Sequence, residues 1–261
     1  MIKIKAPQDI EEMKIAGSLS KAALRRAGAL VRPGATTAEI DAAVEGFIRL
    51  HRGVPTFKGY GGFPGSICAS RNEEVVHGIP SPSVVLQEGD IISIDTGATK
   101  AGWVGDNAWT FYVGSVSEEA KALCECTRDC LEAGIAQAVP GNHLGDIGAA
   151  VQELAEGNGY GVVRDYVGHG VGRIMHEEPS VPNYGRRKHG VKLQVGMVIA
   201  IEPMIVMGSY DTTVLPNRWT VVTRDGGWAA HYENTLAITA GGPVILTEDS
   251  EGPWCPMQGG Y

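Results

Sequence analysis

Four carboxylates are the residues of this sequence whose type and spacing best suit chemistry: Asp95, Asp106, Glu202 and Glu233. Asp95 closes the apolar run Ile91–Ile94, and Glu202 closes the run Val198–Ile201. One such carboxylate is explained equally well as a cap or a surface residue at a strand end. Four at matched positions indicate a shared site, because Asp and Glu are seldom fully buried unless paired or bound to metal. Carboxylates at close quarters repel one another, and cations between them remove that repulsion.

Histidines extend this set, and three of the seven stand out. His169 lies between glycines in Gly168–Gly172, His176 follows seven residues later, and His77 precedes Gly78. Taken alone, a histidine between glycines is more often an ordinary loop residue than a ligand. The other four are interpreted as structural: His51, His143, His189 and His231. One imidazole with four carboxylates is a hard, oxygen-rich site that suits manganese, iron(II) or cobalt. Two such ions can activate a water, which is hydrolase chemistry.

The elements that would position these side chains occur twice, at an offset of 107 residues. Pro33–Val44 matches Pro140–Val151 at six of twelve positions, and Leu86–Asp95 matches Leu193–Glu202 at five of ten. In each copy a Pro-Gly turn leads into a helix with apolar residues at helical spacing, and later a glycine precedes a β-rich run. The pattern predicts two related halves. If they pack about a pseudo-twofold axis, the four carboxylates converge.

Composition narrows the class of protein. Lys and Arg number 22 against 30 Asp and Glu, a net charge of −8, which argues against nucleic acid or an anionic membrane as a direct partner. The first residues lack a long apolar segment, so no signal peptide is predicted and the expected compartment is the cytoplasm. Five irregularly spaced cysteines suggest free thiols. Three of them fall in the predicted helix Ser117–Val139, and they are interpreted as small helix residues rather than zinc ligands: Cys124, Cys126 and Cys130.

Several motifs together resemble a known family. They are Asn72–Pro80 around His77, Gly168–Gly172 with His176-Glu177-Glu178-Pro179, Ile201-Glu202-Pro203-Met204, and Tyr232-Glu233-Asn234-Thr235. The order of the five candidate ligands is similar to that of the pita-bread metallopeptidases, and the motifs are most similar to type I methionine aminopeptidases of the short bacterial form. The resemblance runs from about Ile10 to about Leu246.

The resemblance implies an α+β fold of the pita-bread (creatinase/aminopeptidase) type, with two pseudo-twofold-related halves and an antiparallel sheet covered by helices. Residues 1–261 would form a single catalytic domain, with half-repeats at about 10–115 and 117–246 and a C-terminal tail at 247–261.

The resemblance also implies roles for individual residues. Asp95 would bind one metal ion, Asp106 and Glu233 would bridge two, and His169 and Glu202 would bind the second, with Glu202 also acting as base. His77 and His176 would contact the substrate without binding metal, His176 at the developing oxyanion. The ions would be cobalt, manganese, iron(II) or zinc.

A methionine pocket follows from the same resemblance. Its apolar residues would be Tyr60, Phe63, Cys68, Met175 and Trp219, with Phe57 as a further candidate. Taken alone, each aromatic is more often a core residue than part of a pocket. Two residues depart from the usual pattern, since Val76 stands where some relatives have Cys and Met175 where many have Phe. Methionine is soft and adaptable, so the pocket is expected to be intact but differently shaped.

The expected activity is removal of the N-terminal methionine from nascent polypeptides whose second residue is small, by a monomer that acts near the ribosome. The alternatives are a proline-specific aminopeptidase or dipeptidase of the same fold, and a non-catalytic pita-bread binding protein. Proline-specific relatives usually carry an extra N-terminal domain for which this chain has no room, and non-catalytic relatives have lost ligands that are all present here.

Overall fold

The computed structural model describes residues 1–248, so almost all of the predicted tail 247–261, with Cys255, lies outside the described residues. The helices are α1 (Pro7–Gly28), α2 (Thr37–Leu50), α3 (Glu118–Gln137) and α4 (Leu144–Gly157), with a short 3-10 turn η1 (Tyr60–Gly62). The strands are β1 (Val54–Pro55), β2 (Ile67–Arg71), β3 (Glu74–Val76), β4 (Ile91–Lys100), β5 (Trp103–Tyr112), β6 (Gly161–Val162), β7 (Gly168–Gly170), β8 (Glu177–Val181), β9 (Val198–Ile201), β10 (Met204–Val206), β11 (Thr212–Val214), β12 (Val221–Thr223), β13 (Ala229–His231), β14 (Asn234–Thr239) and β15 (Gly242–Ile245).

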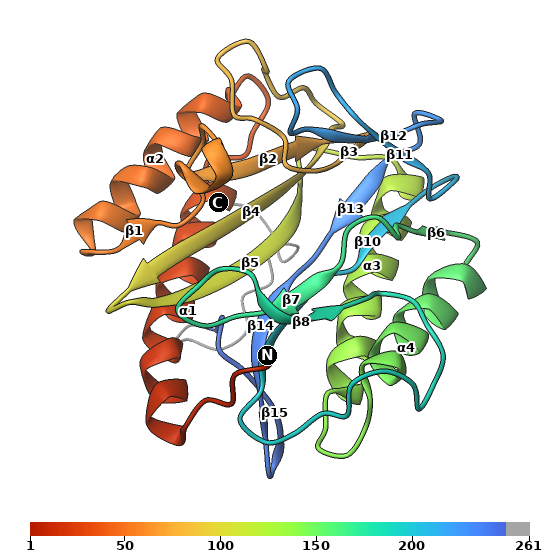
Figure 1. Cartoon of the computed structure of the whole chain (residues 1–261). Helices are drawn as coiled ribbons and strands as arrows, with labels where there is room; N and C mark the ends of the chain where they lie inside the picture. The colour runs from red at the N-terminus through yellow and green to blue at the C-terminus, as the bar shows by residue number, and fades with distance from the viewer. Residues whose placement is uncertain (249–261) are drawn as a thin grey trace.

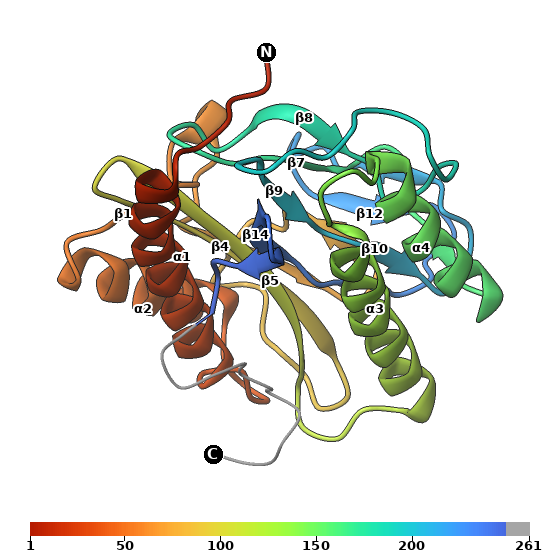
Figure 2. The same cartoon turned by 90° about the horizontal axis from the view of Figure 1, so that it is seen from below.

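The helices form two pairs that flank the strands. In Figures 1 and 2, α1 and α2 lie on one side and α3 and α4 on the other, with the strands between and above them. One sheet joins β1, β2 and β5 to the central β4, and the largest has the order β15-β14-β9-β7-β8. Every strand pairing recorded within residues 1–248 is antiparallel. No helix in this part of the chain has the length and apolar character to cross a membrane.

The sequence repeat recurs in the positions of the elements. Helices α2 and α4 begin at residues 37 and 144 and end at 50 and 157, which is an offset of 107 at both bounds. Strands β4 and β9 begin at residues 91 and 198, again 107 apart. The glycine before each strand has a positive φ, +93° at Gly89 and +90° at Gly196, a conformation that favours glycine. The two copies therefore use the same turn to start the strand that carries a candidate ligand.

Capping explains where the repeated helices start. The Thr36 hydroxyl accepts from Glu39 N, and the Glu39 carboxylate accepts from Thr36 N, which is a capping box at the start of α2. At the equivalent place in α4, Asp146 accepts from His143 N. In α3, Ser117 accepts from Ala120 N, so the helix predicted over 117–139 starts and ends close to those bounds.

The hairpin of β4 and β5 is longer than the sequence suggested. Its ladder runs from the pair Ile91–Tyr112 to the pair Lys100–Trp103, and Ala101 and Gly102 form the turn with positive φ. Such a two-residue turn matches the twist of an antiparallel hairpin. Asp95 therefore lies in the middle of a strand and does not close it, which corrects the prediction from the sequence.

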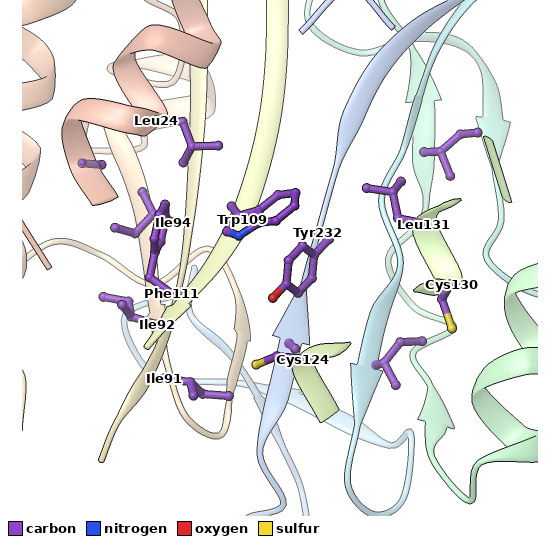
Figure 3. Packing of buried hydrophobic residues seen from close by; sticks show 14 of the residues in the cluster. Leu24, Ile91, Ile92, Ile94, Trp109, Phe111, Cys124, Cys130, Leu131 and Tyr232 are labelled. Carbon is purple, nitrogen blue, oxygen red and sulfur yellow. The ribbon is translucent and has the colours of Figure 1, made fainter. Parts of the chain in front are cut away.

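The core lies between the strands and both helix pairs. Figure 3 shows Trp109 of β5 facing Tyr232, and their ring centroids are 4.6 Å apart. The three clustered cysteines are buried free thiols of α3 that belong to this core, with Cys124 close to the Tyr232 hydroxyl in Figure 3: Cys124, Cys126 and Cys130. They pack as small helix residues, as the sequence indicated.

Candidate metal centre and substrate cavity

The strand ladders bring the candidate ligands to the junction of the two halves. Asp95 of β4 and Asp106 of β5 lie on neighbouring strands, with Asp106 opposite Gly97. In the second half, Asn234 pairs with Ile201, so Glu233 and Glu202 each lie one residue beyond the end of that ladder. Two carboxylates thus come from inside a hairpin, and two from the end of a strand pair.

Hydrogen bonds between the halves hold these strands together. Glu233 N donates to Ala108 O at 3.0 Å, and Thr235 Oγ1 donates to Asp106 O at 2.8 Å. Both bonds join the region that carries Glu233 to the strand that carries Asp106. One backbone bond and one side-chain bond therefore fix the spacing between the carboxylates of the two halves, which converge as the sequence predicts.

His169 lies among the carboxylates. Its Nε2 is 3.5 Å from Asp106 Oδ2 and 3.5 Å from Glu202 Oε1. Its Nδ1 lies 3.0 Å from Gly170 O, which favours the tautomer with the proton on Nδ1 and leaves the Nε2 lone pair free. One ligand atom each from Asp106, His169 and Glu233 lies within 4.8 Å of the others, a separation that one ion could bridge.

The polar atoms of this cluster fit a metal cofactor. Within residues 1–248, Asp95 Oδ1, Asp106 Oδ1 and Glu233 Oε1 are buried without a hydrogen-bond partner. Buried polar atoms without partners are costly, and native proteins rarely tolerate them. The described residues that line the surrounding cavity include no Lys or Arg to neutralise four carboxylates. A hard divalent cation satisfies both the orphaned oxygens and the charge.

The pKa values of the cluster without metal also indicate a cation site. Burial, followed by the charges of neighbouring carboxylates, raises the pKa of Asp95 and the pKa of Glu233 well above their ordinary values. Burial also raises the pKa of Glu202 to about 8, although the charge of His169 opposes that shift. Burial disfavours a charged His169, but Asp106 and Glu202 outweigh it and raise its pKa to about 9. Without metal, this cluster therefore holds protons near neutral pH that a bound cation would displace.

His176 lines the same cavity beside this cluster. Its ring centroid is 4.3 Å from that of His169, and its Nδ1 is 2.8 Å from the Tyr60 hydroxyl. Burial in the cavity and the charge of His169 lower the pKa of His176, which keeps it neutral. If Tyr60 donates to Nδ1, the proton of the neutral imidazole stands on Nε2, where it is available to a ligand.

His77 lies on another side of the same cavity. Its ring meets the edges of Tyr166 and Trp219, at centroid distances of 5.6 and 6.5 Å. Its backbone has φ +60°, an uncommon conformation for a residue with a side chain. Such strain persists where the surrounding structure fixes it, and it often marks functional positions.

An apolar cup adjoins the charged cluster. Phe57, Phe63, Cys68 and Met175 form one buried cluster, with Trp219 packed against it at 5.1 Å from Phe63. Burial, followed by the charges of Asp95 and Asp106, raises the pKa of the Cys68 thiol, which therefore stays neutral and compatible with an apolar ligand. Tyr60 departs from the expectation of an apolar wall, since it is 41% exposed and turns its hydroxyl to His176.

All twelve residues that the sequence nominated line one cavity of about 200 Å³. Six further residues line it as well: Phe57, Val76, Tyr166, Val167, Met204 and His231. Of these, Phe57 was a candidate and Val76 was noted as a departure from the family pattern. Met204 belongs to the motif Ile201-Glu202-Pro203-Met204 but was given no role, and Tyr166, Val167 and His231 lie outside the quoted motifs.

His231 is the principal residue that the sequence interpretation misplaced. It was interpreted as structural, but its side chain is buried at the cavity with Nε2 3.9 Å from Glu202 Oε2. That nitrogen has no hydrogen-bond partner within the described residues. The signal was present in the spacing, because residues two apart on an extended segment point to the same side and His231 stands two before Glu233.

The comparisons with known proteins agree with this architecture. The model of metallopeptidase family M24 matches residues 11–240, and the chain belongs to that family. A methionine aminopeptidase of Clostridium acetobutylicum is 54% identical over 247 residues, which cover 95% of this chain and 99% of the relative. The crystal structure of methionine aminopeptidase from Thermotoga maritima matches with a TM-score of 0.94 and 46% identity, over 95% of this chain and 100% of that one.

These findings confirm the predicted resemblance to methionine aminopeptidases, the pita-bread fold and the hydrolase class. The family also implies divalent metal ions as cofactors. The proline-specific alternative matches less well. Prolidase from Pyrococcus furiosus aligns with a TM-score of 0.72 and 25% identity, over 95% of this chain but 66% of that one.

Proposed function

We propose that the chain is a metal-dependent aminopeptidase that removes the N-terminal methionine from polypeptides whose second residue is small. The proposal rests on one observation: a charged wall and an apolar wall line the same cavity. One wall holds the orphaned carboxylate oxygens beside His169, and the other is the apolar cup of Phe63, Cys68 and Met175. A methionine side chain suits the cup while its peptide bond faces the charged wall. The names of the relatives support the same substrate.

The donor set supports two metal ions, bound as the family pattern implies. Asp95 would hold one ion, Asp106 and Glu233 would contact both, and His169 and Glu202 would hold the other. Cobalt, manganese, iron(II) and zinc are the candidates, and the oxygen-rich ligands favour the harder of them. When bound there, divalent ions would polarise the scissile carbonyl and lower the pKa of water, so that a nucleophile forms near neutral pH.

The protein side chains would then move protons and stabilise charge. Glu202 would accept the proton that the attacking water loses, a task for which a carboxylate beside the reacting atoms is suited. His176, with its proton on Nε2, would donate a hydrogen bond to the oxyanion as it develops on the scissile carbonyl. His77 would contact the scissile amide or the next residue. The buried side chains of the cup would exclude water from that end of the substrate.

A peptidase assay tests the proposal. The metal-reconstituted protein should release methionine from Met-Ala-Ser and leave an Xaa-Pro peptide intact. Cleavage of the Xaa-Pro peptide alone would replace the proposal with the proline-specific alternative. Absence of turnover on both peptides, with metal bound, would favour a non-catalytic binding protein.

The requirement for a small second residue needs its own comparison. Close-packed sites resist extra methylenes, so a β-branched second residue should clash. Met-Ala-Ser should therefore be cleaved far faster than Met-Ile-Ser. Similar kcat/KM values for the two peptides would remove this part of the proposal and leave methionine specificity in place.

The wider setting is part of the same proposal. We infer one catalytic domain with half-repeats at about 10–115 and 117–246, which acts as a monomer on nascent polypeptides in the cytoplasm near the ribosome. The offset of 107 residues between equivalent elements supports the two halves. Sedimentation of the purified protein would test the monomer, and limited proteolysis would test the single domain.

A further inference from the structure

The residues before α1 lie against the second half of the molecule. Lys5 N donates to Gly196 O at 2.7 Å, and a Cβ at Gly196 would approach Lys5 O to 2.7 Å. Figures 1 and 2 show the segment before α1 on the side of the molecule that carries β8, which is far along the chain from α1. The N-terminal segment is therefore bound closely to elements that help to build the cavity.

Two lysines of this segment bind the same carboxylate. Lys5 Nζ is 2.9 Å from Glu177 Oε2, and Lys3 Nζ is 3.0 Å from Glu177 Oε1. The side chains of Lys5 and Glu177 are each 4% exposed, whereas that of Lys3 is 56% exposed. Burial alone would raise the pKa of Glu177, but the bonds from Lys5 and Lys3 outweigh it and lower the pKa. The Lys5–Glu177 pair is thus a buried ion pair, for which loss of one partner has a large effect.

Glu177 contacts both ends of the segment 172–176. It directly follows His176, and a Cβ at Gly172 would lie 2.6–2.7 Å from its carboxyl atoms. Between these ends, Arg173 stacks on Trp103 at 4.0 Å, and Trp103 Nε1 donates to Glu12 of α1. Ile174, at the tip, is 54% exposed. The segment that carries Met175 and His176 is therefore held at its base, from the N-terminal segment and α1, while its tip is in solvent.

We propose that Lys5 is a positioning residue, which acts through Glu177 to hold segment 172–176 so that His176 and Met175 face the substrate. The inference rests on the proposed function for the roles of those two residues. Without Lys5, only Lys3 would remain on Glu177, and an exposed ion pair contributes little. A displacement of about 1 Å at a catalytic group can reduce the rate roughly 10²-fold, so the contact would govern both turnover and methionine binding.

Four variants of the full-length, metal-reconstituted protein test this role: Lys5→Met, Lys5→Arg, Lys3→Met and Lys14→Met. Lys5→Met keeps the length of the side chain and removes its charge, and should lower kcat/KM for Met-Ala-Ser by roughly 10- to 10²-fold. Lys5→Arg should restore most of the activity, and Lys3→Met should have a smaller effect. Lys14 pairs with Glu11 on the exposed face of α1, so Lys14→Met should behave as wild type.

Amide hydrogen exchange across residues 172–177 supplies a readout that needs no turnover. Lys5→Met should accelerate exchange there, and Lys14→Met should not. If wild type itself fails to cleave any Met-X peptide, the proposed function fails, while the exchange data still decide whether Lys5 holds the segment. Exchange and kinetics in Lys5→Met that both match wild type would overturn the inference.

The double variant Lys5→Met with Glu177→Gln separates positioning from stability. The double variant leaves no unpaired buried charge, so its unfolding midpoint should lie closer to that of wild type than the midpoint of Lys5→Met does. Its kcat should nevertheless stay low and its exchange at 172–177 fast, because the contact is still missing. Recovery of kcat and of slow exchange together with stability would show a merely structural role for the pair.

Discussion

The two walls of the cavity are built in different ways. Asp95 and Asp106 lie inside a hairpin of two ten-residue strands, and Glu202 and Glu233 adjoin the paired residues Ile201 and Asn234. Apart from Cys68 of β2, the apolar wall draws on connecting segments: Phe57 and Phe63 on either side of η1, Met175 between β7 and β8, and Trp219 between β11 and β12. The charged wall is held by ladder hydrogen bonds, whereas the apolar wall depends on side-chain packing.

This difference shows that the fold holds charged groups more rigidly than apolar groups. Charged groups must be held at fixed distances, because small displacements of a charge or ligand have large effects on binding and rate. Apolar contacts are non-directional and tolerate adjustment. Substitutions in the charged wall should therefore abolish function, and volume-conserving substitutions in the apolar wall should only tune it.

The largest effect should come from the carboxylates. Asp106→Ala and Glu202→Ala should each eliminate measurable turnover, because each removes a ligand and leaves a cation poorly neutralised. Wild-type activity should disappear with chelator and return with cobalt, manganese or iron(II). The measurements are peptidase rate and metal stoichiometry after gel filtration.

Asp90→Asn is a matched control, since Asp90 is a buried carboxylate outside the cavity that accepts from Gln87 N and from Asn72 Nδ2 and pairs with Arg71. It should lower stability by roughly 1.5–3 kcal/mol, the range for loss of a hydrogen bond to a charged group, without changing metal content. Full activity of the chelated wild type, or unchanged metal content in Asp106→Ala, would contradict the assignment of the charged wall.

His176 lies between the two walls, and its replacement should have the next largest effect. His176→Ala should lower kcat by roughly 10²- to 10³-fold, the range for loss of one oxyanion donor, with nearly unchanged metal content. Tyr60→Phe should lower kcat less, because it removes only the bond that orients the imidazole. The exposed His189, replaced by Ala, serves as control. Loss of bound metal in His176→Ala would make His176 a ligand instead.

The two walls also differ in how far the sequence predicted them. The halves and the candidate ligands could be proposed because Asp95 and Glu202 follow equivalent apolar runs 107 residues apart, and a repeated backbone brings equivalent residues together. The length of β4 and the position of Asp95 within it were not evident, since the apolar run stops at Asp95 and Gly97 follows it, whereas glycine is uncommon inside a strand. His231 was missed because its place in the cavity depends on the direction of one short strand. Lys5 and Glu177 are 172 residues apart, and no local pattern links them.

The third largest effect should be the release of protons on metal binding, which is expected of the charged wall and not of the apolar wall. Without metal, the raised pKa values of Glu202, about 8, and His169, about 9, mean that both hold protons at neutral pH. A bound cation requires the ionised carboxylate and a free imidazole nitrogen, so metal binding should release protons. Affinity should therefore rise from about pH 7 to about pH 9, by up to tenfold per pH unit for each proton displaced.

Calorimetry of metal binding in buffers of different ionisation enthalpy measures that release directly. Binding of methionine analogues to the apolar wall, with metal already present, should release far fewer protons because Phe63 and Met175 do not titrate. A metal affinity that is independent of pH over this range would show that the cluster is already ionised without metal, contrary to the expectation from its burial.

The smallest effect should come from Met175, the residue at which the cup departs from many relatives. Met175→Leu conserves volume, and such a swap in a packed apolar site costs less than about 1.5 kcal/mol, so KM for Met-Ala-Ser should change by less than roughly tenfold. The kcat value should stay close to wild type, because Met175 contacts the side chain of the substrate and not the reacting carbonyl. Ile174→Leu, at the exposed neighbouring position, should change neither constant. A fall in kcat comparable to that of His176→Ala would mean that packing in the cup also fixes the catalytic histidine, and the division between a rigid charged wall and an adjustable apolar wall would then fail at the one segment that serves both.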